Sequence, residues 1–284
     1  MARVEGERSV GAVRVPAMLY GTAWKEERTA GLVRLALANG FTGIDTANQR
    51  KHYFEAGVGD AVAGALADGT LTRAALFLQT KFTYARGQDH RLPYDREASF
   101  AEQVRQSLAS SLEHLRTDYV DSLLLHGPSR PAGIVASDRE VWRTMEALQQ
   151  AGKTRLIGVS NVSAAQLATL HAEATVKPAF VQNRCFARDG WDRDVRAFCR
   201  ANGIVYQGFS LLTANARELG DARVQGVLRR VGRSLGPVVF RFALQLGMLP
   251  LTGTTSETHM REDLASLDFE LSDADVAAIE SVGD

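Results

Sequence analysis

Residues 40–81 read GFTGIDTANQRKHYFEAGVGDAVAGALADGTLTRAALFLQTK, and they contain one complete unit of the pattern that decides the fold. A short apolar run, Thr42–Asp45, is followed by a longer helix-like segment, Glu55–Asp68, and then by a second apolar run, Ala75–Lys81. Gly69 directly follows the helix-like segment, at a position where a glycine commonly ends a helix. The stretch therefore predicts a strand, a helix and a second strand parallel to the first.

The same alternation continues in both directions from this stretch. The expected strands are Ala17–Gly21, Thr42–Asp45, Ala75–Lys81, Tyr119–His126, Arg155–Ser160, Ala179–Gln182, Gly203–Phe209 and Met248–Thr252. The helix-like segments between them include Glu26–Asn39, Glu55–Asp68, Glu97–Leu115, Asp138–Gln150, Ser163–His171 and Asp192–Ala201. Ser163 and Asp138 stand where helix N-caps are expected. Strands that each precede a helix indicate an α/β fold whose parallel strands are buried on both faces.

Two architectures fit this order, a closed (β/α)8 barrel and an open doubly wound sheet. A doubly wound dinucleotide-binding fold would carry Gly-x-Gly-x-x-Gly after its first strand, whereas Gly21-Thr22-Ala23-Trp24 follows that strand here. Eight units in about 250 residues match the size of a TIM barrel. We therefore predict a TIM barrel that forms a single domain over residues 1–284. A short N-terminal hairpin is expected around Ser9–Val15, and an extra C-terminal helix at Ser272–Val282, with Ser272 as its N-cap.

The composition is typical of a globular chain. Of the 284 residues, 45% are hydrophobic, and 33 basic residues balance 33 acidic ones. Nucleic acid is not an expected partner, because there is no basic excess, and no membrane partner is expected either. The apolar stretch Val238–Leu251 is interrupted by Arg241 and Gln245 and is too short to cross a bilayer. The first ten residues lack the apolar core of a secretory signal, and Cys185 and Cys199 are too few for a disulfide framework, so a cytoplasmic location is expected.

Three successive expected strands end in an ionisable residue, namely Asp45, Lys81 and His126. The C-terminal ends of barrel strands share one face, on which TIM-barrel enzymes carry out their chemistry, so these side chains are expected to converge. Each one alone could be a solvated loop charge, but three in succession favour a site. Only five of the 33 Lys and Arg residues are lysines, and Asp45 opposite Lys81 would keep that ammonium charged. A charged lysine lowers the pKa of a nearby phenol, and Tyr53 is the candidate proton donor, with a structural tyrosine as the alternative.

These residues lie in motifs that resemble the aldo-keto reductase superfamily, and the resemblance runs from Gly21 to about Leu271. The motifs are GFTGIDTA (40–47), a Tyr ahead of Val-Gly (58–59), LQTK (78–81), LLLHGP (123–128), GKTRLIGVSN (152–161) and KPAFVQN (177–183). The resemblance implies a (β/α)8 oxidoreductase that reduces aldehydes and ketones with a nicotinamide nucleotide and without a metal.

By this resemblance, the catalytic tetrad is Asp45, Tyr53, Lys81 and His126. Tyr53 would protonate the carbonyl oxygen as hydride arrives from the nicotinamide. Lys81, paired with Asp45, would lower the pKa of Tyr53, and His126 would orient the carbonyl and help to relay the proton. Arg50 stands where the family has its tyrosine, and Tyr53 lies three residues further along the chain in a longer loop.

The resemblance also implies that Ser160, Asn161 and Gln182 hold the nicotinamide carboxamide, since such side chains can donate and accept hydrogen bonds. The other expected cofactor-binding residues are Phe209, Ser210, Leu212, Gly253, Thr254, Thr255, Ser256, His259 and Asp263. Phe209 replaces the stacking tyrosine of the family and keeps an aromatic face. Leu251 stands where the family has a lysine. The hydroxyl-rich helix start at Thr254–Ser256 can still bind a phosphate, so NADP(H) is expected ahead of NAD(H).

Aromatic residues that follow expected strands are candidates for the substrate pocket, chiefly Trp24 and Phe82, with Tyr84 and Phe186 beside them. Ordinary packing is the alternative for each. The expected function is the reduction of a small-molecule aldehyde or ketone, or the reverse oxidation. Two alternatives remain open: a nucleotide-binding regulatory subunit on the same fold, and a Schiff-base aldolase with Lys81 as nucleophile. The sequence indicates neither the particular carbonyl substrate nor the oligomeric state.

Overall fold

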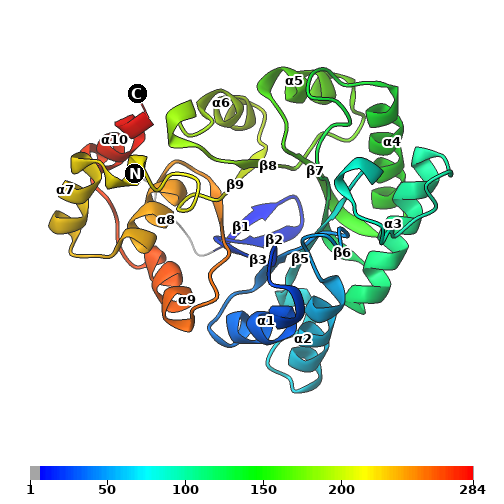
Figure 1. Ribbon diagram of the computed structural model, residues 1–284, viewed down its shortest axis with the longest axis horizontal. Helices are drawn as coiled ribbons and strands as arrows, with labels where there is room; N and C mark the ends of the chain where they lie inside the picture. The colour runs from blue at the N-terminus through cyan, green and yellow to red at the C-terminus, as the bar shows by residue number, and fades with distance from the viewer. Residues whose placement is uncertain (1–6, 284) are drawn as a thin grey trace.

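The computed structural model describes residues 7–283, which form a closed barrel of eight parallel strands surrounded by helices (Figure 1). The strands are β3 (Leu19–Gly21), β4 (Gly43–Asp45), β5 (Phe77–Phe82), β6 (Val120–Leu125), β7 (Thr154–Ser160), β8 (Phe180–Arg184), β9 (Val205–Phe209) and β10 (Leu249–Thr252). They follow one another around the ring, and β10 pairs with both β9 and β3 to close it. The predicted (β/α)8 fold is confirmed, and every strand boundary lies within two residues of the expected one. Residues 1–6, where no secretory signal is expected, and Asp284 lie outside the described residues.

Ten α-helices of the described chain cover the barrel from the outside (Figure 1). They are α1 (Thr29–Ala38), α2 (Glu55–Ala67), α3 (Phe100–Leu115), α4 (Ala136–Gln150), α5 (Ala164–Glu173), α6 (Arg193–Ala201), α7 (Ala222–Val231), α8 (Leu235–Gln245), α9 (Glu257–Leu264) and α10 (Asp273–Glu280). The apolar stretch Val238–Leu251 divides between the buried helix α8 and strand β10. None of the described helices combines the length and the apolar character that crossing a membrane requires.

Side chains at the helix starts satisfy backbone N–H groups that have no partner within the helix. Ser163 caps α5, and Ser272 caps the predicted C-terminal helix α10. The expectation that Asp138 is an N-cap is wrong, because α4 begins two residues earlier, at Ala136. The Asp138 carboxylate instead reaches back and accepts a hydrogen bond from the backbone N–H of Val135 at 3.0 Å.

The predicted N-terminal hairpin is confirmed as strands β1 (Glu7–Val10) and β2 (Val13–Pro16), which lie across the middle of the ring in Figure 1. Val13 and Val15 of β2 pack in an apolar cluster with the first residues of several barrel strands, which are Leu19, Phe77, Phe180 and Leu249. The hairpin therefore closes the N-terminal end of the barrel. The opposite end, where the strands terminate in polar residues, stays open to ligands.

Helices α2 and α3 approach each other so closely at Gly59 that no side chain fits there. A Cβ atom placed on Gly59 would lie 1.9 Å from the backbone carbonyl oxygen of His114 in α3. Gly64, in the same helix, would meet nothing within 4 Å. Alanine substitutions at Gly59 and Gly64 therefore distinguish the steric cost of an added methyl group from the higher helix propensity of alanine.

We expect Gly59→Ala to lower the free energy of unfolding by about 1–3 kcal/mol, because the backbone of α3 must move to accept the methyl group. Gly64→Ala, its matched control, should leave that free energy unchanged or raise it by about 0.5–1 kcal/mol. Urea denaturation followed by circular dichroism measures both. Equal effects of the two substitutions would contradict the close approach of α2 and α3.

Candidate active site

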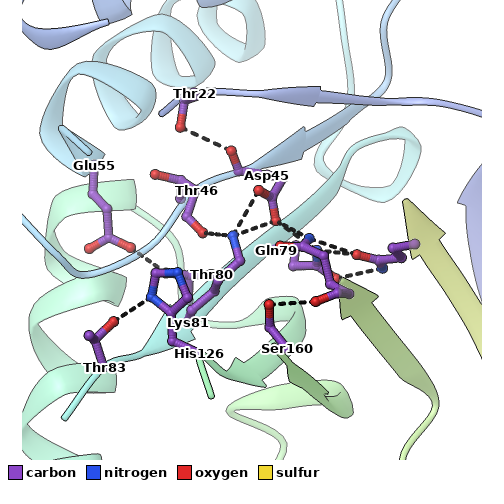
Figure 2. A network of polar contacts seen from close by, with 12 residues as sticks. Thr22, Asp45, Thr46, Glu55, Gln79, Thr80, Lys81, Thr83, His126 and Ser160 are labelled. Carbon is purple, nitrogen blue, oxygen red and sulfur yellow. Dashed lines mark hydrogen bonds and ion pairs between the residues drawn. The ribbon is translucent and has the colours of Figure 1, made fainter. Parts of the chain in front are cut away.

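A buried ion pair between Asp45 and Lys81 joins the neighbouring strands β4 and β5 (Figure 2). The Lys81 Nζ atom donates to both carboxylate oxygens of Asp45, at 2.8 and 2.7 Å, and to the carbonyl oxygen of Thr46 at 2.8 Å. Only 1% of Lys81 and 3% of Asp45 are exposed. Burial lowers the pKa of Lys81, and the Asp45 carboxylate opposes that change. All three ammonium protons are thus committed within the protein.

A hydrogen-bond network of three glutamines inside the barrel holds the Asp45 carboxylate in place. The Gln79 and Gln182 amides donate to Asp45 Oδ1 at 2.7 and 3.0 Å. The same two amides donate to Gln207 Oε1, and Gln207 Nε2 returns a hydrogen bond to Gln79 Oε1 at 2.9 Å. This network links β4 with β5, β8 and β9. Gln79 and Gln207 were missed in the sequence, although a glutamine inside an apolar strand is a signal of a buried polar contact.

Tyr53 and His126 lie beside this ion pair. The Tyr53 ring meets the His126 ring edge-on, with centroids 5.9 Å apart, and Lys81 Nζ lies 5.1 Å from the centre of the Tyr53 ring. The structure therefore brings Asp45, Tyr53, Lys81 and His126 together. Within residues 7–283, the Tyr53 hydroxyl has no hydrogen-bond partner, which leaves it available to a ligand.

The expectation that Lys81 lowers the pKa of Tyr53 is wrong for this structure. Burial raises the pKa of the Tyr53 phenol, and the Asp45 carboxylate raises it further. The physical reason is that Asp45 balances the ammonium charge of Lys81, whose three protons point to Asp45 and Thr46 and not to the phenol. Tyr53 is therefore fully protonated at neutral pH.

His126 is neutral. Burial lowers its pKa to about 3, with further contributions from the nearby Lys81 and His52. Its Nδ1 atom lies 2.6 Å from the Thr83 hydroxyl, a contact drawn in Figure 2. When Thr83 is the donor in this contact, the imidazole proton is on Nε2.

A cavity of about 720 Å³ runs from the tetrad to the start of α9. The expected site residues that line it are Trp24, Asp45, Tyr53, His126, Ser160, Asn161, Gln182, Phe209, Ser210, Leu212, Gly253, Thr254, Thr255, His259 and Asp263. Ser256 does not line it, because its hydroxyl caps α9 by accepting from the backbone N–H of His259. Burial raises the pKa of Asp263 to about 6, and its carboxylate accepts from the Thr252 hydroxyl at 2.6 Å.

The wall nearest the tetrad offers acceptors for an amide group. Asn161 Nδ2 donates to the carbonyl oxygen of His126, and Gln182 Nε2 is held by Asp45 and Gln207. The side-chain oxygens of Asn161 and Gln182 have no hydrogen-bond partner in the described part of the chain. Both residues line the cavity, so these oxygens fit the N–H groups of a nicotinamide carboxamide.

Lys25 is a cavity residue that the sequence reading missed. Its Nζ atom donates to the carbonyl oxygen of Gly253 at 2.8 Å, and it is the one lysine or arginine among the described residues that line this cavity. Burial, together with the nearby charge of Arg28, lowers the pKa of Lys25 to about 8. Its position directly after the motif Gly21–Trp24 was the available signal.

A second cavity, of about 550 Å³, shares Trp24, Tyr53 and His126 with the first. Trp24 is 70% exposed, and its ring lies 3.9 Å from that of His52. Tyr84 also lines this second cavity.

The expectation that Phe82 lines the substrate pocket is wrong, because Phe82 lines neither cavity and is 1% exposed. Side chains alternate along a strand, so Phe82 points away from the face that Lys81 occupies and packs against Tyr84 and Tyr94. Phe186 also lines neither cavity, and its ring lies beneath the guanidinium of Arg188.

The aldolase alternative is excluded because a substrate in either cavity has no access to the Lys81 amine. Lys81 lines neither cavity, and its Nζ atom has no proton that is not already donated. A Schiff-base lysine must reach the substrate carbonyl as a free amine. In residues 7–283, no three His, Cys, Asp or Glu side chains are grouped so that they could hold a metal ion.

Comparison with known proteins gives a consistent result. The sequence model of the Aldo/keto reductase family matches residues 17–284. The chain is 29% identical to aldo-keto reductase family 4 member C11 of Arabidopsis thaliana over 276 residues, which cover 91% of this chain and 82% of that protein. It is 30% identical to NADPH-dependent codeinone reductase 1-4 of Papaver somniferum over 295 residues, 95% and 87% of the two chains. It is 28% identical to the glyoxal reductase of Bacillus subtilis over 250 residues, 88% and 82% of the two chains.

Solved structures agree with the fold. The aldo-keto reductase AKR2E4 of Bombyx mori, solved in complex with NADP, superposes with a TM-score of 0.80 at 25% identity, covering 95% of this chain and 89% of that one. An aldo/keto reductase of Brucella melitensis superposes with a TM-score of 0.79 at 26% identity, covering 95% of both chains.

We expect Lys81→Met to lower the free energy of unfolding by about 3–5 kcal/mol, because it leaves the Asp45 carboxylate buried without its counter-charge. The double variant Lys81→Met/Asp45→Asn removes both charges and should recover a large part of that loss. Denaturant titration of the wild type, the single variant and the double variant measures the difference. A double variant no more stable than Lys81→Met would argue against an ion pair at this position.

Proposed function

The chain belongs to the aldo/keto reductase family, and we propose that it reduces a small aldehyde or ketone to the alcohol with NADPH, Tyr53 being the proton donor. The observation that carries this proposal is the cavity that joins the unpartnered Tyr53 hydroxyl to the acceptors of Asn161 and Gln182. Related proteins are named as NADPH-dependent reductases, and a structural neighbour holds NADP. The reverse oxidation uses the same residues. No feature of residues 7–283 favours the regulatory alternative.

The nicotinamide nucleotide supplies the hydride when it is bound. The side-chain oxygens of Asn161 and Gln182 would hold its carboxamide, and the ring of Phe209 offers it an aromatic face. Lys25 supplies a positive charge for its diphosphate. The hydroxyls of Thr254 and Thr255 and the start of α9 would bind a 2′-phosphate, which favours NADP(H) over NAD(H).

Tyr53 provides the proton that completes the reduction. As the carbonyl carbon accepts hydride, its oxygen becomes an alkoxide, which is a stronger base than a phenolate. The proton on Tyr53 Oη therefore moves to that oxygen although burial raises the pKa of Tyr53. A neutral His126 donates a hydrogen bond to the same oxygen from Nε2 and orients it.

Asp45 and Lys81 are positioning residues in this mechanism. Lys81 lines neither cavity, so it acts on the substrate only through the loop that carries Tyr53 and through the strand ends it joins. We also propose a cytoplasmic location, with which the unpaired, buried Cys185 and Cys199 are consistent.

We expect Tyr53→Phe to lower kcat for aldehyde reduction by about 10²–10⁴-fold, because it removes the general acid and leaves the ring in place. The Kd for NADPH should stay within about twofold of wild type, since the hydroxyl is not a cofactor contact in this proposal. Steady-state loss of NADPH absorbance and a fluorescence titration measure the two quantities. Tyr119→Phe, at the other end of the barrel, is the control, and wild-type turnover by Tyr53→Phe would remove Tyr53 from the mechanism.

We expect the affinity for NADPH to fall above about pH 8. A bound diphosphate raises the pKa of Lys25 from its value of about 8 in the free protein, so binding takes up a proton at higher pH. Below pH 8 Lys25 is already charged and the Kd is nearly constant, whereas above pH 8 the Kd rises by up to about tenfold per pH unit. Fluorescence titrations between pH 7 and pH 9.5 measure this.

Lys25→Met should bind NADPH more weakly at pH 7 and lose most of the dependence on pH. Lys153→Met, whose side chain is exposed at the opposite end of the barrel, serves as the control and should titrate like the wild type. If Lys25→Met keeps the same pH dependence, another group is responsible.

A further inference from the structure

The second cavity is lined by cations and by no carboxylate. Arg86 follows β5, Arg130 lies in the loop after β6, and Arg184 is the last residue of β8. All three line the cavity that contains Tyr53 and His126. Among the described residues that line it, none is an aspartate or a glutamate. The guanidinium groups therefore come from three separate segments of the chain to the cavity that Tyr53 and His126 also line.

None of these three guanidinium groups has a carboxylate partner within residues 7–283. Arg86 donates to the carbonyl oxygen of Pro128, and the Arg184 guanidinium lies 5.6 Å from the centre of the Phe209 ring. The Arg130 side chain makes no hydrogen bond or ion pair in the same part of the chain. All three residues are exposed, so their charges face the cavity mouth and the solvent.

Neighbouring arginines behave differently. Arg50 pairs with Glu27 at 2.9 Å, and Arg91 pairs with Asp89. A lone arginine at a protein surface is ordinary, but three unpaired ones that line one cavity are a concentration of charge that the protein itself does not balance.

One carboxylate that contacts a residue of this cavity, Asp138, is already engaged. Asp138 is buried and accepts hydrogen bonds from the Tyr84 hydroxyl at 2.8 Å and from the backbone N–H of Ser129 at 2.7 Å. It does not line the cavity. The two histidines that line this cavity, His52 and His126, are neutral at neutral pH, because burial lowers the pKa of both.

We propose that the carbonyl substrate of this enzyme also carries an anionic group, a carboxylate or a phosphate, which Arg86, Arg130 and Arg184 bind. This inference rests on the proposed reductase function and names the class of its substrate. The planar guanidinium fork matches the two oxygens of a carboxylate or a phosphate. A cavity of about 550 Å³ is within the usual range for small-molecule sites, so the carbonyl and the anion fit in one cavity.

The anion lies away from the reacting carbon. Its binding energy is therefore nearly equal in the ground state and in the transition state, and the preference should appear mainly in KM. Added salt should weaken it, because the three guanidinium groups are exposed to solvent.

The test compares matched pairs of aldehydes: succinic semialdehyde with butanal, and glyceraldehyde 3-phosphate with glyceraldehyde. We expect kcat/KM for the anionic member to exceed that for its neutral partner by about tenfold or more in at least one pair. The pair that shows the preference identifies the group as carboxylate or phosphate. The triple variant Arg86→Gln/Arg130→Gln/Arg184→Gln should reduce the ratio to near one, mostly through KM.

Arg143→Gln is the control, because Arg143 is exposed on α4 and lines neither cavity. A ratio near one in the wild-type enzyme for both pairs would overturn the proposal. An anionic preference that survives in the triple variant would overturn the assignment to these arginines.

A binding measurement separates this proposal from the proposed function. Succinate and inorganic phosphate are titrated calorimetrically into the protein saturated with NADP⁺, which requires no turnover. We expect saturable binding of at least one of them, weakened by about tenfold or more in the triple variant and unchanged in Arg143→Gln. If all four aldehydes remain unreduced, the reductase function fails, and this titration still decides the anion site. Absence of saturable binding for both anions overturns it.

Discussion

The buried ion pair of Asp45 and Lys81 is the interaction on which the rest of this site depends. A single buried charge costs several kcal/mol unless it is paired and hydrogen-bonded, so neither partner is tolerated alone. The structure meets that condition fully, with three donated protons on Lys81 and a carboxylate that also accepts from Gln79 and Gln182. Because the network spans four strands, it holds the barrel rim in one arrangement. The loop that carries Tyr53 starts from this rim.

Tyr53 and His126 line both cavities, so in the proposed reduction one cavity would hold the nucleotide and the other the carbonyl substrate. The first, of about 720 Å³, contains the Lys25 ammonium group and the side-chain oxygens of Asn161 and Gln182. The second, of about 550 Å³, contains three guanidinium groups. A chain with equal numbers of acidic and basic residues can thus still present a positive field at one opening. Net charge alone would not have indicated this.

Much of the fold and part of the site could be predicted from the sequence. Asp45, Lys81 and His126 could be placed together because strand order and strand ends put them on one rim. Phe82 does not share the site of Lys81, because adjacent side chains of β5 point to opposite faces of the strand. The direction of the pKa shift of Tyr53 was wrong because burial is a property of the packed structure and leaves no local pattern. Lys25 was missed because it lies in a loop, where no periodicity indicates which way a side chain points.

The hairpin of β1 and β2 contributes Val13 and Val15 to an apolar cluster, and the glutamine network lies between that cluster and the rim. The barrel interior therefore has two layers, an apolar layer near the N-terminal ends of the strands and a layer of hydrogen-bonded glutamines nearer their C-terminal ends. A substitution that changes volume in the apolar layer alters packing and lowers stability, because protein interiors are close-packed. The two layers therefore have different roles: the apolar layer contributes to stability through packing, and the glutamine layer holds the strand ends in place through directed hydrogen bonds.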